Sequence, residues 1–141
     1  MGLDAVVYKN RTKLPLDPER AGLRLDESTG EWYSETDELP DPIRLEGVKA
    51  LHKRLGNASL IAAIAAEARS LMPMDSTVLS RILLSGTQAG EAIPPETVES
   101  LKQEVTVLRN SSPSPELARF LNDLDELIAS AQDNHNPIAF V

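Results

Sequence analysis

Acidic residues are the side chains of this chain whose number and spacing most suggest chemistry, and they are concentrated in one segment. Residues 17–41 contain nine acids and two arginines, so the segment carries a charge of −7 in a chain of net charge −8. The single tryptophan, Trp32, and the neighbouring Tyr33 lie in the same segment. Aromatic side chains often anchor protein interfaces, and clustered charge steers a partner of opposite sign. The predicted protein-binding residues are Asp26, Glu27, Glu31, Trp32, Tyr33, Glu35, Asp37 and Glu38.

The same segment also has a purely structural interpretation. A solvated hairpin would bury Trp32 against the helices beneath it, while cations at Lys9, Arg11, Lys13 and Arg44 offset part of the acidity. Acids that surround an aromatic residue are common on ordinary protein surfaces. The leading functional hypothesis is nevertheless a non-catalytic binding module for a basic protein, of the inhibitor or immunity type.

The other titratable residues are isolated along the chain. His52 is expected on the border of the buried face of a helix, and His135 is expected in a turn. Glu67 stands alone in an apolar stretch, where burial would make it a candidate acid or base, although an exposed edge beside Arg69 explains it as well. A small enzyme built on Glu67, His52 or Asp4 is therefore the alternative function, and a structural homo-oligomer subunit is the third.

Neither a metal nor a cofactor is expected. The chain has no cysteine and two histidines, which rules out thiolate ligands, and the histidines lack the His-Glu-x-x-His spacing of a zinc site. Asp26, Ser28 and Gly30 resemble the opening of a calcium-binding loop. Such a loop needs an oxygen ligand at its fifth position, where Gly30 stands, and glycine at its sixth.

Composition narrows the range of partners. The acidic pI of about 4.7 disfavours binding to nucleic acid, because phosphate-backbone recognition requires clustered lysine and arginine. The longest apolar run, residues 60–66, is about a third of the roughly 20 residues that a membrane-spanning helix needs. The first residues lack the pattern of an export signal, and the absence of cysteine fits a reducing compartment. We therefore expect a cytoplasmic protein without nucleic-acid or membrane partners.

Chain length and patterning predict a single domain over residues 1–141. Residues 1–43 are expected to form a strand, a loop and the acidic hairpin, in which Gly30 supplies a positive φ angle. Residues 44–134 are expected to be helical. Residues 136–141 end on apolar side chains, which predicts a terminal strand paired with residues 3–8.

The helical region divides at its capping residues into five expected helices. The first covers residues 44–55, with Leu45, Val48, Leu51 and Leu55 on one face and Gly56 as its end. The second, residues 60–72, has Asn57 as its expected cap and is apolar all round, which predicts a central position. Asp75, Pro95 and Ser114 are the expected starts of the other three. The predicted fold class is α+β, mainly helical, with about five helices packed on a small antiparallel sheet that includes both chain termini.

Overall fold

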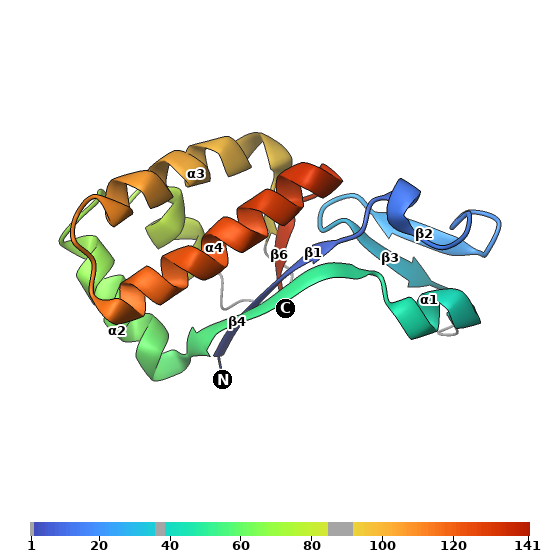
Figure 1. The fold of residues 1–141 in the computed structure, drawn as a ribbon, viewed down its shortest axis with the longest axis horizontal. Helices are drawn as coiled ribbons and strands as arrows, with labels where there is room; N and C mark the ends of the chain where they lie inside the picture. The colour runs from blue at the N-terminus through green and yellow to red at the C-terminus, as the bar shows by residue number, and fades with distance from the viewer. Residues whose placement is uncertain (1, 36–38, 85–91) are drawn as a thin grey trace.

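The computed structural model describes residues 2–35, 39–84 and 92–141 (Figure 1). Over these residues the chain has the predicted α+β fold, with five helices and a four-stranded antiparallel sheet. The strand order is β4-β1-β6-β5, with β4 (Lys49–Asn57) and β5 (Ala92–Ile93) at the edges. The two strands nearest the chain ends, β1 (Gly2–Tyr8) and β6 (Ile138–Phe140), are the inner pair. The prediction that both termini enter the sheet is confirmed.

The main hydrophobic core lies between this sheet and the helices. These are α2 (Ala58–Arg69), the π-helical segment η2 (Val78–Leu83), α3 (Pro95–Arg109) and α4 (Pro115–Asn134). Helix α4 contributes the longest buried stripe, which includes Leu117, Phe120, Leu124 and Ile128. It is α4 that crosses the middle of the helical layer in Figure 1, so the central position predicted for the second helix is wrong.

Helix α2 buries only one side although its sequence is apolar all round. Ile61, Ile64, Ala65 and Ala68 are buried, whereas alanines 62, 63 and 66 are exposed. Exposing a methyl group to water costs little, so alanines do not force a helix into the centre of a fold.

Helix starts are capped partly by residues that the sequence identified and partly by a neighbouring helix. The Asn57 side chain accepts a hydrogen bond from Leu60 N at 2.8 Å, and the Ser114 hydroxyl accepts one from Leu117 N at 3.2 Å, as predicted. Asp75 does not cap the third helix. Glu104 of α3 does so instead, because its carboxylate accepts hydrogen bonds from Thr77 N and Val78 N at 3.0 and 2.9 Å.

The first expected helix, over residues 44–55, is mostly wrong. The short helix α1 covers Asp41–Glu46, and residues Lys49–Asn57 form strand β4, which pairs with β1. Leu51 and Leu55 are four residues apart and so share a face in a strand as well as in a helix, which is why the pattern misled. Strand β4 covers β1, an inner strand that would otherwise be an open edge.

Residues 9–48 form an excursion from the sheet, which we call the lobe. Strand β1 ends at Tyr8 and β4 begins at Lys49, and between them Lys9 N donates a hydrogen bond to Val48 O at 2.9 Å. The lobe contains the 3-10 turn η1 (Arg11–Lys13), the hairpin β2 (Leu23–Asp26) and β3 (Glu31–Ser34), and α1. It has a separate small core made of Leu14, Leu23, Trp32 and Ile43. In Figure 1 it lies to one side of the helices.

Replacing residues 10–47 with Asn-Gly should leave a folded protein. The main core contains no residue from this range, and Lys9 and Val48 are already hydrogen-bonded as the closing pair of a two-residue hairpin loop. A cooperative thermal transition by circular dichroism, with helical signal retained, is the expected result. Loss of that transition would show that lobe and sheet fold only as one unit.

Candidate functional site

The acidic hairpin forms as predicted and is closed by its own side chains. Leu25 pairs with Trp32 and Arg24 pairs with Tyr33 across β2 and β3, and Gly30 has a φ angle of 82°. The Asp26 carboxylate accepts hydrogen bonds from the Ser28 hydroxyl and from Ser28 N at 2.6 and 3.0 Å. These bonds hold the pKa of Asp26 below its ordinary value, with the hydroxyl as the larger cause.

The two aromatic residues of the hairpin lie on opposite faces. Trp32 points into the lobe core, where it is 7% exposed and donates a hydrogen bond from its indole nitrogen to Lys9 O at 3.0 Å. Tyr33 lies on the outer face and is 41% exposed. The burial of Trp32 agrees with the structural interpretation of that residue, so an aromatic anchor on the outer face would be Tyr33.

Many of the acids lie beside cations of the lobe itself. Arg11 bonds to both Glu19 and Asp17, at 2.8 and 3.2 Å, and Glu35 lies 3.0 Å from Arg24. All of these side chains are well exposed, so each pair contributes little to stability. Among the described residues of the hairpin, the exposed acids Glu27 and Glu31 form no ion pair. Asp37 and Glu38 lie outside the described residues.

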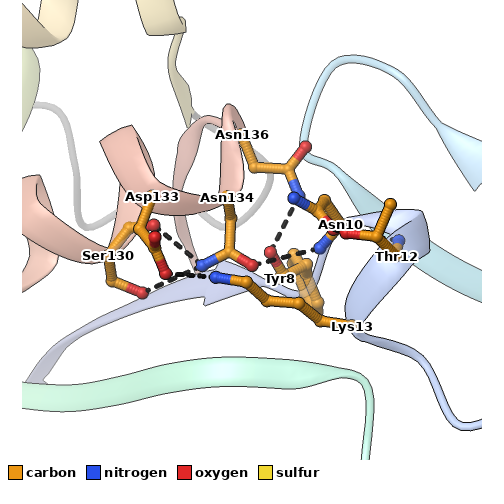
Figure 2. A network of polar contacts seen from close by, with 8 residues as sticks. All are labelled: Tyr8, Asn10, Thr12, Lys13, Ser130, Asp133, Asn134 and Asn136. Atoms are coloured by element: carbon orange, nitrogen blue, oxygen red, sulfur yellow. Dashed lines mark hydrogen bonds and ion pairs between the residues drawn. The ribbon is translucent and has the colours of Figure 1, made fainter.

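Three asparagines fix the lobe to the end of α4 (Figure 2). The side-chain oxygen of Asn134 accepts a hydrogen bond from Asn10 N at 3.1 Å, and the Asn136 amide donates one to Tyr8 O at 2.8 Å. Asn134 is buried, and its amide nitrogen donates to Ser130 O at 2.8 Å. Lys13 and Asp133 add an ion pair beside them. Sequence reasoning missed this junction, because an asparagine in a turn gives no sign of a partner more than 100 residues away.

His135 ends α4 in the turn that the sequence predicted. It adopts a left-handed conformation, with φ 54° and ψ 39°, and its backbone N–H bonds to Ala131 O. The residue is exposed and lines two pockets, one of about 390 Å³ shared with lobe residues and one of about 330 Å³ shared with Pro95 and Val98 of α3.

Tyr8 lies at the base of the lobe, and the acids of the hairpin affect the pKa of its phenol. It is 3% exposed at the end of β1. Its pKa is raised above 10.0, first because burial disfavours the phenolate and then because the negative charges of Glu31 and Asp26 oppose ionisation. Those two acids are at the closed end of the hairpin, so their field reaches the junction.

The residues of the alternative enzyme hypothesis are separated by the fold. On the sheet face opposite the helices, Asp4 Oδ1 lies 3.4 Å from His52 Nε2, and Asp4 Oδ2 accepts a hydrogen bond from Arg54 at 2.9 Å. His52 is exposed on strand β4. The expectation that it borders the buried face of a helix is therefore wrong. Glu67 is elsewhere and half-buried. Its carboxylate accepts hydrogen bonds from Ser114 N, at 2.9 Å, and from the Ser114 hydroxyl, so it holds the start of α4.

The chain matches no protein-family model, no curated protein and no solved structure. Within the described residues, no group of three or more histidine, aspartate or glutamate side chains could hold a metal ion. Within the same residues, no helix is long and apolar enough to cross a membrane.

The raised pKa of Tyr8 gives a direct test of the junction. The chain has two tyrosines, so in a Tyr33→Phe variant the absorbance change of phenolate formation reports Tyr8 alone. We expect its midpoint above pH 10, and stability should fall as pH rises past 10 because the unfolded chain ionises first. Glu31→Gln should move the midpoint down. An ordinary midpoint in Tyr33→Phe would contradict the described burial.

Trp32→Ala should unfold the lobe and spare the rest. Truncating a buried tryptophan costs about 3–5 kcal/mol, which is large against the four-residue lobe core. Amide exchange should become fast over residues 10–47 and stay slow in α4 and β1. Trp32→Phe, which keeps most of the apolar volume, is the matched control. Uniform loss of protection would show that the two cores are not separable.

Proposed function

We propose that the chain is a non-catalytic binding module whose lobe binds a basic surface of another protein, as an inhibitor or immunity-type protein would. The observation that carries this proposal is the placement of the acid-rich segment. Its acids are gathered on a lobe that leaves and rejoins the sheet at neighbouring strands, with its own core. A partner can therefore cover this surface without disturbing the main core, as is common for binding loops on a rigid scaffold.

The outer face of the hairpin has the features of a docking surface. Tyr33 is 41% exposed. Arg24 is its partner on β2, Glu31 precedes it on β3, and Glu35 follows the end of β3. Tyrosine offers a large contact area and a polar tip at low entropic cost, which favours interfaces. The acids around it would speed the approach of a basic partner more than they would tighten the final complex.

The proposal is tested by capture from the native cell lysate on the immobilised chain. A basic protein should be retained at about 0.05 M salt and released at about 0.5 M, since the Debye length falls well below 10 Å over this range. The double variant Glu27→Gln/Glu31→Gln should slow association with that protein and flatten its salt dependence. Tyr33→Ala should chiefly speed dissociation, by about 30-fold if the residue is worth 2 kcal/mol.

A charge-matched variant separates local from general effects. Asp75 and Glu96 are exposed and lie outside the lobe, so Asp75→Asn/Glu96→Gln changes the net charge equally. This control should bind like the unmodified chain. Equal losses in both double variants would mean that net charge alone attracts the protein, and retention of no basic protein at low salt would refute the proposed function.

The second candidate function is an enzyme that uses His52 as a general base. The Asp4 carboxylate beside Nε2 would orient the imidazole and leave its other nitrogen to take a proton, with Arg54 next to it. Under this alternative, His52→Gln would abolish activity and leave the capture of a basic protein intact. The opposite pattern, in which lobe variants lose the partner and His52→Gln changes nothing, supports the binding module.

A further inference from the structure

We propose that the pocket between the lobe and the end of α4 receives an arginine side chain of the basic partner. This inference rests on the proposed function and assigns the partner's anchoring group. The pocket has a volume of about 390 Å³, which is ample for one side chain. It is lined from both sides of the junction, and the lining residues used below are Arg11, Glu19, Leu25, Trp32, His135 and Asn136.

Two oxygen atoms in the lining have capacity for a guanidinium. Glu19 accepts the Arg11 hydrogen bond on Oε1, and Oε2 has no partner among the described residues. The side-chain amide of Asn136 donates an N–H to Tyr8 O, and its side-chain oxygen accepts no hydrogen bond from the described part of the chain. A planar guanidinium carries several N–H donors in a fixed fork, so it can serve two separate acceptors, which an ammonium group does less well.

The electrostatic field of the pocket favours a cation. The pocket lies at the carboxyl end of α4, where the helix dipole is negative and the last turn contains no basic residue. Asp26 and Glu31 lie at the closed end of the hairpin, where Gly30 packs against Asn136 of the lining, so their negative charges are close to the pocket. An incoming cation would therefore be attracted both to the helix end and to the hairpin.

Two residues of the lining, Arg11 and His135, can carry a positive charge that would oppose such a ligand, and the charge of Arg11 is already balanced. Its guanidinium bonds to Glu19 and Asp17 together, and Arg20 lies 3.7 Å from the other oxygen of Asp17, so the four residues sum to zero charge and Arg11 leaves no net positive charge there. Arg11 is half exposed, with 51% of its side chain accessible, and it lies at the surface of the pocket. The pair between Arg11 and Glu19 shows that this carboxylate suits a guanidinium.

The apolar part of the lining matches the aliphatic part of an arginine. Leu25 is 41% exposed although it stands on the inner face of the hairpin beside Trp32, and both line the pocket. An arginine side chain buries its methylene groups on such surfaces while its charged end stays in a polar environment. Contact with the partner would cover Leu25, the exposed leucine of the hairpin.

The test is a nuclear magnetic resonance titration of the isotope-labelled full chain with Nα-acetylarginine amide. Saturable shifts should appear at the Trp32 indole N–H and at the side-chain amides of Asn10 and Asn136, with a dissociation constant on the order of millimolar. Nα-acetylcitrulline amide has nearly the same shape without the charge. It should bind at least about five-fold more weakly, because its hydrogen bonds lack charge assistance.

Matched variants decide whether the pocket is responsible. Glu19→Gln should weaken binding of the arginine amide about five-fold, whereas Glu27→Gln, at the exposed hairpin loop, should leave it unchanged. Equal binding of the citrulline compound, equal effects of the two variants, or shifts confined to the outer face around Tyr33 would each overturn the proposal.

The same variants separate this inference from the proposed function. If Glu27→Gln/Glu31→Gln loses the captured partner while Glu19→Gln keeps it, the pocket proposal fails and the binding module stands. If the arginine amide occupies the pocket but no basic protein is retained from the lysate, cation binding stands and the proposed protein partner is refuted.

Discussion

The antiparallel pairing of β1 with β4 is the interaction on which the rest of the structure depends. It makes β1 an inner strand, so that Leu3, Ala5 and Val7 face the helices while Val6 and Tyr8 are buried on the other side. It also brings the two ends of a 40-residue excursion together at the Lys9–Val48 hydrogen bond. Pairing of β1 with β4 fixes the two ends of the lobe, so the sheet offsets the entropic cost of closing this long loop. The lobe therefore needs only a small core of its own.

The lobe is joined to the end of α4 by polar contacts, while Val48 at its base packs against both the lobe core and the apolar cluster of Val6, Tyr8 and Ala139. Asn134 is buried at the junction with its side-chain oxygen and nitrogen both hydrogen-bonded, and Asn136 holds the end of β1. Satisfied polar groups of this kind specify one arrangement of two parts, because a displaced lobe would leave buried donors and acceptors unpaired. The pocket of about 390 Å³ lies beside this polar junction, whereas a purely apolar contact would have filled that space.

Several carboxylates of this protein hold other parts of its structure in place, and this affects which of its acids can be assigned to binding. Glu67 and Glu104 each accept backbone hydrogen bonds at the start of another helix, and Asp26 closes the hairpin. A negative group at a helix start is favoured by the exposed N–H groups and by the helix dipole. Within the described residues of the hairpin, the exposed acids Glu27 and Glu31 have no such partner, and they are the acids that we propose are available to a second protein.

The sequence alone predicts the α+β class, the hairpin around Gly30, the starts of α2, α3 and α4, and the entry of both chain ends into the sheet. These features depend on local signals: capping side chains, prolines at helix starts, a glycine at positive φ and short apolar runs. That residues 49–57 form a strand depends on tertiary contacts. Apolar residues four positions apart fit a helix and a strand equally well, and the strand forms because it covers the edge of β1. The use of Glu67 at α4, the joining of Asn10 to Asn134 and the hydrogen bond from the Trp32 indole to Lys9 O likewise depend on partners far away in the chain, to which local propensity is blind.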